Sequence, residues 1–385
     1  MEIFSIVRFL LFKTYERRSQ MNKMLNCLAN KVMCTAVVAL GAFAASAESV
    51  LTTNALYDAV NTDVSVGYQV SGLEGDEIAV VFTNDACEVI NWKVPARLND
   101  VQFLVVGGGG GGAAGDTNNY GVPGGGGGGV VTGSVFSLKK DFEITVIVGK
   151  GGKGGMGDSS LGTSNNGIYS DQIVIAENGG DSKFLVNNTP YVTAPGGGGD
   201  KGSSTSTTQK GGQGGSNSGS RTTSIATWDS SLFYTNSTYI TASIFGNPGG
   251  KANSTGPASA GGGGGALEAG HDGVSSPRYR GGDGGAGLTN SITGVDVVYG
   301  SGGGGGQSYH TSKACIAGKG GAGAGDGGAY YAETSAKSGL ANQGGGGGGG
   351  WRRSNKFSNG GNGGSGIVVF RYKDPFKPGF KVIVR

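Results

Sequence analysis

The chain has little charge and little proline, and each scarcity argues against a class of protein. Charged side chains make up 15 % of the 385 residues, with 30 basic against 27 acidic ones and a formal net charge of +3. A nucleic-acid-binding protein normally has a strong basic excess, so this balance argues against a polyanion partner. Nine prolines are too few for collagen, which needs abundant proline beside glycine at every third position.

Glycine is the residue that the chain has in excess. It supplies 83 of the 385 residues, about one in five, against an average share near 7 %. An ordinary enzyme with a single core rarely uses so much of a residue that cannot fill that core. All but five of the glycines lie between Gly107 and Gly366, where they reach 30 % of the chain. The composition therefore indicates an unusual exported or structural protein.

Residues 1–47 have the pattern of an export signal. Lys31 precedes a short apolar core at Val37–Ala44, and Ala45–Ala47 (Ala-Ser-Ala) is the small-x-small pattern that signal peptidase cleaves. The mature chain is then expected to begin at Glu48. The whole apolar stretch is shorter than the roughly 20 residues that span a bilayer, so a retained membrane anchor is the less favoured alternative.

Removing this segment changes the balance of charge and of cysteine. The mature chain has 24 basic and 25 acidic residues, a net charge of −1, and its remaining cysteines are Cys87 and Cys315. These two could form one disulfide in an oxidising compartment, but their spacing does not decide it. The start codon is open between Met1, Met21 and Met24. We expect a secreted protein or one held non-covalently at the cell surface, with the periplasm as an alternative.

The mature chain divides into segments by composition. We expect a helix at Leu51–Asn61 and a hairpin of Glu77–Asn84 with Cys87–Lys93. Further strands are predicted at Val101–Val106, Val130–Leu138, Phe142–Val148, Gln172–Ala176, Val295–Tyr299, Gly366–Tyr372 and Phe380–Val384. The expected boundaries are an N-terminal segment at 48–76, a glycine-rich β domain at 77–373 with an insertion at 216–248, and a C-terminal strand or tail at 374–385. The apolar stretch Ser224–Phe245 of that insertion either buries itself or binds a partner.

The glycine occurs in two patterns. Uninterrupted runs lie at Gly107–Gly112, Gly124–Gly129, Gly196–Gly199, Gly261–Gly265, Gly302–Gly306 and Gly344–Gly350. Runs with a period of three, X-Gly-Gly, lie at Lys150–Gly157, Lys210–Gly215, Arg280–Gly287, Lys319–Gly323 and Asn359–Gly366. A period of three matches the left-handed helix with three residues per turn, which makes no internal hydrogen bonds. Each backbone group must then find a partner on a neighbouring helix, and glycine permits that close approach.

Two interpretations of this zone are open. A flexible linker is one, because glycine loses more conformational entropy on ordering than any other residue. Packed polyglycine helices are the other, and we favour them because the X-Gly-Gly register recurs and adjoins strong strands. The runs are also numerous enough to supply neighbours for one another. The predicted fold class is mainly β: a small antiparallel β-sandwich with projecting, packed polyglycine-II helices.

Several stretches, taken in order, carry a family resemblance. They are Val94–Gly112 (VPARLNDVQFLVVGGGGGG), Pro123–Val135 (PGGGGGGVVTGSV), Phe142–Gly155 (FEITVIVGKGGKGG), Ala341–Trp351 (ANQGGGGGGGW) and Gly360–Tyr372 (GGNGGSGIVVFRY). The chain resembles the bacterial and phage glycine-rich domain family over about Glu77–Lys373. Its glycine-rich style is also similar to part of the ectodomain of anaplastic-lymphoma-kinase-type receptors and to the tips of some phage tail-fibre adhesins. The resemblance implies a small β-sandwich with polyglycine helices and binding loops at their ends; it implies no catalytic residues.

Motifs for catalysis and cofactors are weak. At 30 % glycine, chance alone produces roughly seven GxGxxG matches in this zone, and no GxxxxGK[ST] occurs. Gly154–Asp158 (GGMGD) is one residue short of a calcium-binding repeat, so a calcium site would be incidental. His271 and His310 lie in turn-like contexts, without the pattern of a nucleophile or a zinc site. We therefore expect no catalytic residues, no metal and no cofactor.

Aromatic and arginine residues beside glycine runs are the better candidates for function. Trp351, Arg352 and Arg353 follow seven glycines, and Tyr330 and Tyr331 follow a shorter run. Tyr, Trp and Arg dominate interaction surfaces. The alternative is that these side chains cap the end of the glycine array.

The sequence thus favours a non-enzymatic, adhesin-like interaction module that binds a glycan or a protein. The alternative is a structural matrix or appendage component that self-associates. An enzyme acting on a polymer is a remote third possibility.

Overall fold

The computed structural model describes residues 68–73, 76–83, 89–114, 122–156, 175–200, 213–220, 223–252, 259–274, 279–307, 316–330, 332–353 and 356–376. All of them belong to one unit of the chain. The predicted signal, the helix at Leu51–Asn61, the last strand at Phe380–Val384 and both Cys87 and Cys315 lie outside the described residues. None of the helices within the described ranges is long and apolar enough to cross a membrane.

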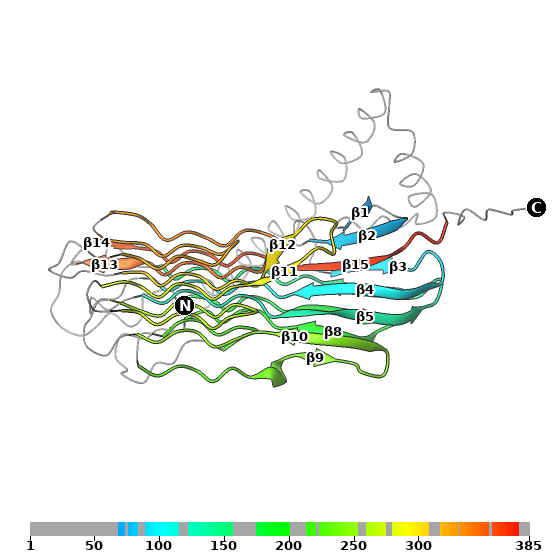
Figure 1. Cartoon of the computed structure of the whole chain (residues 1–385), viewed down its shortest axis with the longest axis horizontal. Coiled ribbons are helices and arrows are strands. Elements are labelled where there is room, and N and C mark those ends of the chain that lie inside the picture. The colour runs from blue at the N-terminus through cyan, green and yellow to red at the C-terminus, as the bar shows by residue number, and fades with distance from the viewer. Residues whose placement is uncertain are drawn as a thin grey trace, which may run out of the picture. The chain divides into compact units, whose positions relative to one another are not determined.

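A six-stranded antiparallel sheet carries most of the long strands (Figure 1). Its order is β1-β2-β15-β4-β5-β10, so the last strand among the described residues lies at its centre. The strands are β1 (Tyr68–Gly72), β2 (Glu77–Phe82), β15 (Ile367–Lys373), β4 (Leu98–Val106), β5 (Val130–Leu138) and β10 (Ile240–Phe245). The sheet begins with β1, ahead of the boundary at Glu77 that the sequence predicts.

A second antiparallel sheet has the order β3-β6-β7-β8-β9. Its strands are β3 (Val89–Lys93), β6 (Glu143–Ile147), β7 (Ser182–Val186), β8 (Thr189–Ala194) and β9 (Tyr234–Thr235). Buried aromatic rings join the two sheets: Phe184 of β7 lies 5.0 Å from Phe370 of β15 and 5.5 Å from Phe103 of β4. Trp92 of β3 stacks on Phe370 at 5.7 Å. The two sheets therefore form the sandwich that the sequence predicts, and the mainly-β fold class is confirmed.

The predicted hairpin of Glu77–Asn84 with Cys87–Lys93 is wrong. Both strands exist, but β2 pairs with β1 and β15, whereas β3 pairs with β6 in the other sheet. Their burial patterns explain the separation. β2 is buried along nearly its whole length, as expected for an inner strand, whereas β3 alternates buried and exposed residues, as expected for an edge strand with one wet face.

The insertion Ser224–Phe245 supplies an edge strand to each sheet. It contains the short 3₁₀ helix η1 (Ser230–Leu232) and then β9 and β10. The buried side chain of Ile240 faces the core, and the indole of Trp228 donates to the Gly215 carbonyl at 2.8 Å. Tyr234 and Tyr239 keep 45 % of their surface exposed. The insertion is therefore part of the sandwich, and it buries only some of its apolar side chains.

The glycine zone forms an ordered array of extended helices that runs from the sandwich (Figure 1). The segment Gly107–Gly112 shows the rule. Its successive amides donate to three different segments in turn and then repeat the order, at 2.8–2.9 Å. The acceptors, in sequence, are Gly129, Gly180, Gly364, Gly126, Glu177 and Gly361. Its carbonyls accept from three further segments, through Gly197, Gly152 and Gly347. This is the three-residue period of packed polyglycine-II helices.

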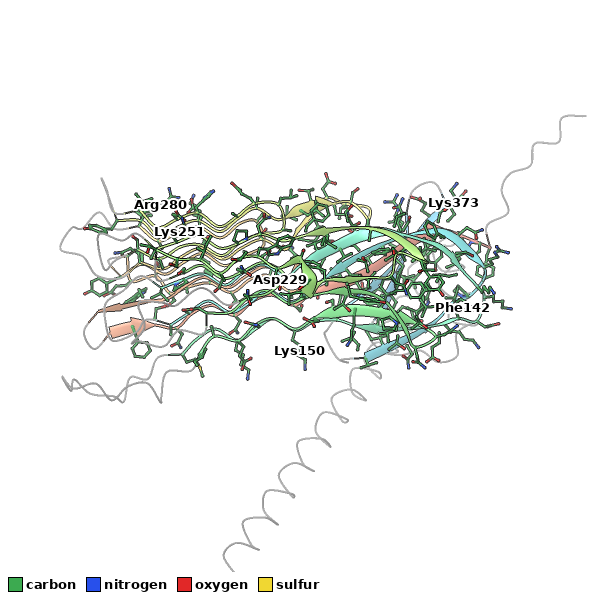
Figure 2. All side chains as sticks on the ribbon, turned by 90° about the horizontal axis from the view of Figure 1, so that it is seen from below. Phe142, Lys150, Asp229, Lys251, Arg280 and Lys373 are labelled. Atoms are coloured by element: carbon green, nitrogen blue, oxygen red, sulfur yellow. The ribbon has the colours of Figure 1, made fainter. Side chains whose placement is uncertain are left out.

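Crowding of backbone on backbone requires glycine inside the array. A Cβ placed on Gly110 would lie 2.2 Å from the Gly198 carbonyl oxygen, and one on Gly303 would lie 2.1 Å from the Gly347 carbonyl oxygen. No side chain fits at such distances. The uninterrupted runs are buried throughout, whereas the described X residues of the period-three runs are exposed or half-buried at the surface. Figure 2 shows Lys150, Lys251 and Arg280 on the outside of the array. The two glycine patterns thus separate inner from outer helices.

Side chains of X residues on outer helices cap amides that have no backbone acceptor. Such amides occur both in the outer helices and in the run Gly196–Gly199. Asn178 and Asp181 accept from the Gly199 and Gly196 amides at 2.9 and 3.0 Å. Asn362 accepts from the Gly154 amide at 2.8 Å in the same way. Short polar side chains at X therefore complete the hydrogen bonding at the surface of the array.

Candidate functional site

A hairpin terminates the array at the end away from the sandwich (Figure 1). Its strands are β13 (Trp351–Arg353), which follows directly on the glycine run ending at Gly350, and β14 (Lys356–Ser358). In the antiparallel register, Trp351 lies opposite Ser358 and Arg352 lies opposite Phe357. The sequence interpretation placed its main candidates on this hairpin.

The ring of Trp351 is a structural anchor. It is 7 % exposed, its indole donates to the Thr334 carbonyl at 2.8 Å, and the half-buried Tyr330 packs edge-on at 5.2 Å. Whether Trp351 contacts a ligand stays a prediction. A large ring fills the space at the end of the array, where the glycine run stops, and this placement agrees with the capping alternative. The structure thus brings Trp351 and Tyr330 together.

The other predicted residues are only partly placed. Arg352 and Arg353 occupy β13, which fixes their backbone, but their side chains lie outside the described residues. Tyr331 also lies outside the described residues. Whether any of the three touches a ligand stays a prediction.

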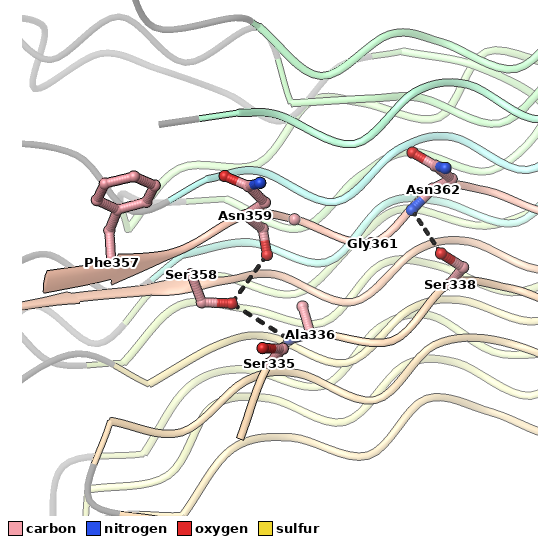
Figure 3. Close-up of a pocket in the computed structure, with 9 residues that line it drawn as sticks. Ser335, Ala336, Ser338, Phe357, Ser358, Asn359, Gly361 and Asn362 are labelled. Carbon is pink, nitrogen blue, oxygen red and sulfur yellow. Dashed lines mark hydrogen bonds between the residues drawn. The ribbon is translucent and has the colours of Figure 1, made fainter. Parts of the chain in front are cut away.

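A groove lies beside this hairpin, and Figure 3 shows it from close by. We call it the distal groove; its volume is about 360 Å³, within the usual range for ligand sites. One wall is the segment Ser335–Ser338, and the other runs from Phe357 through Asn362. The Ala336 amide donates to the Ser358 hydroxyl at 3.3 Å, and the Asn362 amide donates to the Ser338 hydroxyl at 3.1 Å. Two serine hydroxyls therefore join the walls.

Among the residues that the structure describes, those lining the distal groove carry no charge. Its polar side chains are hydroxyls and amides, from Ser335, Ser338, Ser358, Asn359 and Asn362. Phe357 is half-buried at one end of the groove, and Figure 3 shows its ring on the other side of β14 from the Ser358 hydroxyl. Sequence reasoning did not single out this groove, because its walls come from two segments about twenty residues apart. The only signal was the position of Phe357 just before a period-three run.

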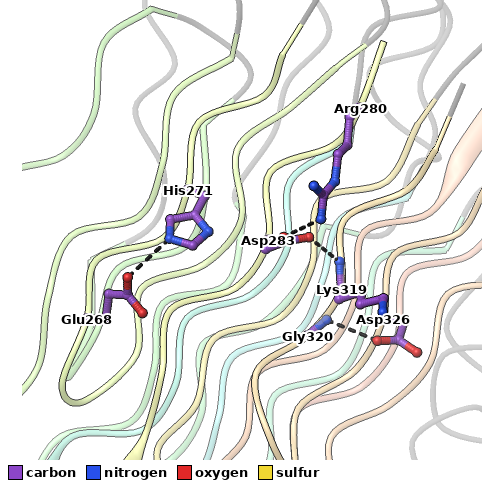
Figure 4. A network of polar contacts seen from close by, with 7 residues as sticks. All are labelled: Glu268, His271, Arg280, Asp283, Lys319, Gly320 and Asp326. Atoms are coloured by element: carbon purple, nitrogen blue, oxygen red, sulfur yellow. Dashed lines mark hydrogen bonds and ion pairs between the residues drawn. The ribbon is translucent and has the colours of Figure 1, made fainter. Parts of the chain in front are cut away.

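Charged side chains gather on another part of the array surface (Figure 4). Asp283 pairs with Arg280 and also accepts from the Lys319 amide at 2.7 Å. Asp326 accepts from the Gly320 amide at 3.0 Å and pairs with Lys337 at 2.8 Å. Burial alone would raise the pKa of Asp326, but these hydrogen bonds hold it below its ordinary value. These carboxylates cap backbone amides of the array, and this structural role explains their position.

The two histidines of the mature chain and the question of a metal site complete the survey of candidate residues. His271 lies 3.2 Å from the Glu268 carboxylate on the exposed surface, and His310 lies outside the described residues. Within the described ranges, no group of three or more His, Cys, Asp or Glu side chains is arranged to hold a metal ion.

Comparison with known proteins gives one finding. Residues 83–373 match the family model of a glycine-rich domain, which covers most of the sandwich and the whole array. No curated protein matches the chain.

Proposed function

The chain belongs to the glycine-rich domain family, and we propose that it is an exported, non-enzymatic interaction module whose distal groove binds a glycan. The observation that carries the proposal is the lining of that groove, where uncharged hydroxyl and amide side chains lie beside Phe357. Sugars offer hydroxyl groups to such partners and an apolar face to an aromatic ring.

The array supports this role mechanically. Its helices are joined to one another by backbone hydrogen bonds of mostly 2.8–3.0 Å. The hairpin and the distal groove are therefore held in a fixed position at one end of the array, away from the sandwich. Groups held in place before binding lose less entropy when the ligand arrives, so a rigid support favours affinity.

The proposed function is tested by glycan-array screening of the purified protein with a Phe357→Ala variant. We expect discrete hits that Phe357→Ala weakens at least tenfold, a loss of about 1.4 kcal/mol. Leu340→Ala is the matched control, because Leu340 is 57 % exposed on the same outer segment and does not line the groove. Hits that survive Phe357→Ala unchanged, or no hits at all, would overturn the proposal for this groove.

The second candidate is a structural component that self-associates. It is favoured by the outer segment Ser335–Leu340, where the Ser335 and Ser338 amides have no acceptor within the described part of the chain. A glycine-rich segment of a second copy could accept from these two amides. The side-chain caps on other outer helices oppose this idea, because they close the edges that growth would need. Light scattering decides it: polymers that form without any ligand would favour the structural role.

A further inference from the structure

A second groove lies on the outer face of the six-stranded sheet, beside the hairpin that covers part of this face. We call it the platform groove; its volume is about 590 Å³. Its floor contains Gln102 of β4, Thr132 and Ser134 of β5, and Ser243 of β10. Its wall is the loop between β11 (Leu288–Asn290) and β12 (Val297–Tyr299).

The floor interrupts an otherwise apolar face. On the same strands nearer the array, Leu104, Val106 and Val130 are fully buried beneath the β11–β12 hairpin, together with Tyr299. Further along, the side chains become polar and the hairpin no longer covers them. The register aligns Gln102 with Ser134 across β4 and β5, and Thr132 with Ser243 across β5 and β10. Small polar side chains side by side leave the open space of the groove.

The wall is held rigidly. Ile292 is 5 % exposed and packs into the apolar cluster under the hairpin. The Asn290 carboxamide accepts from the Ile292 amide at 2.8 Å, and the Gly294 amide donates to the Ser291 carbonyl at 2.9 Å. Arg371 of β15 donates to the same Ser291 carbonyl at 3.2 Å. The loop is therefore fixed before any ligand binds, which reduces the entropy lost on binding.

The charges of the groove select against anions. Arg371 pairs with Glu77, to which its Nε donates at 2.8 Å, so its positive charge is already matched. Asp296 in the wall is exposed, and no cation pairs with it among the residues that the structure describes. The groove thus offers a carboxylate, amides and hydroxyls, and the formal charge of Arg371, its partner Glu77 and Asp296 together is −1. A ligand that suits it has many hydroxyl groups and no acidic group.

An aromatic ring extends the floor. Side chains two positions apart on a strand share a face, so Phe136 follows Thr132 and Ser134 on the outer side of β5. Phe136 is 51 % exposed. An exposed ring beside a row of hydroxyl and amide groups provides the apolar surface on which a sugar ring can stack.

We propose that the platform groove binds a carbohydrate free of acidic groups, neutral or bearing a free amine. In this site Asp296 accepts hydrogen bonds from hydroxyl or ammonium groups, Gln102 and Ser243 bond further hydroxyls, and Phe136 stacks on a sugar ring. The site is separate from the distal groove and adds a second ligand contact to the module.

The test is calorimetric titration of the purified protein with three probes: N-acetylglucosamine oligomers, glucosamine oligomers and uronic-acid oligomers. We expect one or both of the first two to bind and the acidic oligomers not to bind. Phe136→Ala should weaken binding about tenfold, and Asp296→Asn should reduce binding of the glucosamine oligomers by a similar factor. Ser137→Ala, on the opposite face of β5, is the matched control and should change nothing.

The outcomes separate this inference from the proposed function. Binding that survives Phe136→Ala and Asp296→Asn, with both variants melting at the wild-type temperature, would overturn the inference. Binding abolished by Phe357→Ala alone would also overturn it, and would leave the distal groove as the glycan site. Failure of all three probes to bind would likewise contradict a carbohydrate site here. So would binding of an extended peptide that Asp296→Asn abolishes.

Discussion

Replacing a single inner glycine by alanine tests the array most sharply, and Gly125 is the position of choice. A Cβ on Gly125 would lie 2.2 Å from the Gly110 carbonyl oxygen, where contacts normally exceed 3.0 Å. Gly110 cannot move freely, since its amide donates to Gly126 at 2.9 Å and its carbonyl accepts from the Gly347 amide at 2.9 Å. Relief of the clash therefore breaks hydrogen bonds inside the array.

The magnitude follows from those bonds. Moving Gly110 by the required ~1 Å disrupts its two hydrogen bonds and strains the 2.8 Å bond from the Gly125 amide to Gly347. An unsatisfied buried backbone group costs about 1–3 kcal/mol, so the two disrupted bonds cost about 2–6 kcal/mol and the strained bond adds to this loss. The gain of up to about 1 kcal/mol from a less flexible unfolded chain does not offset it. Since domains are stable by only about 5–15 kcal/mol, Gly125→Ala should unfold much of the protein or lower its melting temperature severely.

The assay is denaturant unfolding followed by circular dichroism, with Gly72→Ala as the matched control. Gly72 lies in the edge strand β1, and a Cβ there meets nothing within 4 Å. Alanine should therefore be neutral or stabilising by about 0.5–1 kcal/mol at that position. If Gly125→Ala unfolds at the same denaturant concentration as Gly72→Ala, the crowded array is refuted.

Further expectations concern the caps, the anchor and the effect of pH. Asn178→Ala removes the side-chain acceptor of an array amide and should lower the free energy of unfolding by about 1 kcal/mol. Glu177→Ala is the control: it removes only an exposed ion pair and should lower the free energy of unfolding by less than about 0.5 kcal/mol. Trp351→Phe keeps an anchoring ring but loses the indole donor, and we expect a loss of about 1–2 kcal/mol that thermal unfolding would detect; an unchanged melting temperature would contradict the anchor. The pKa of Asp326 lies below its ordinary 3.8, so its stabilising effect is present above that pH and fades as the pH falls through the folded value. The stability difference between wild type and Asp326→Asn should therefore shrink in acid, and a constant difference would exclude this linkage. The raised pKa of Lys337 acts in the opposite range, stabilising below its ordinary 10.5 and losing that effect as the pH rises through the folded value.

The glycine array was predictable because its geometry depends on the local sequence pattern. A helix with three residues per turn exposes every third residue when one side faces solvent, so Lys150 and Lys153 stand outside while the glycines between them contact neighbours. An uninterrupted run such as Gly344–Gly350 indicates a helix surrounded on all sides. Strands rich in β-branched and apolar residues, such as β4 and β5, were also found within a few residues of their bounds.

Pairings and grooves were less predictable, because they depend on residues far apart in the chain. β2 and β3 follow one another in sequence but belong to different sheets, and no local feature reveals that β15 pairs with β2. The β7–β8 hairpin was missed although Asn187 and Asn188, at φ 46° and 62°, form the kind of two-residue turn that favours hairpins. The burial of Trp351 depends on Thr334 and Tyr330, which only the folded array brings close.

Amide hydrogen exchange across the glycine zone tests the central claim most directly. The account predicts that amides of the inner runs, such as Gly124–Gly129 and Gly344–Gly350, exchange as slowly as those of the central strand β15, since most of them donate to a buried carbonyl. The outward amides of Ser335 and Ser338 should exchange fast. Rapid exchange throughout Gly107–Gly366 would contradict the array and make this zone a linker.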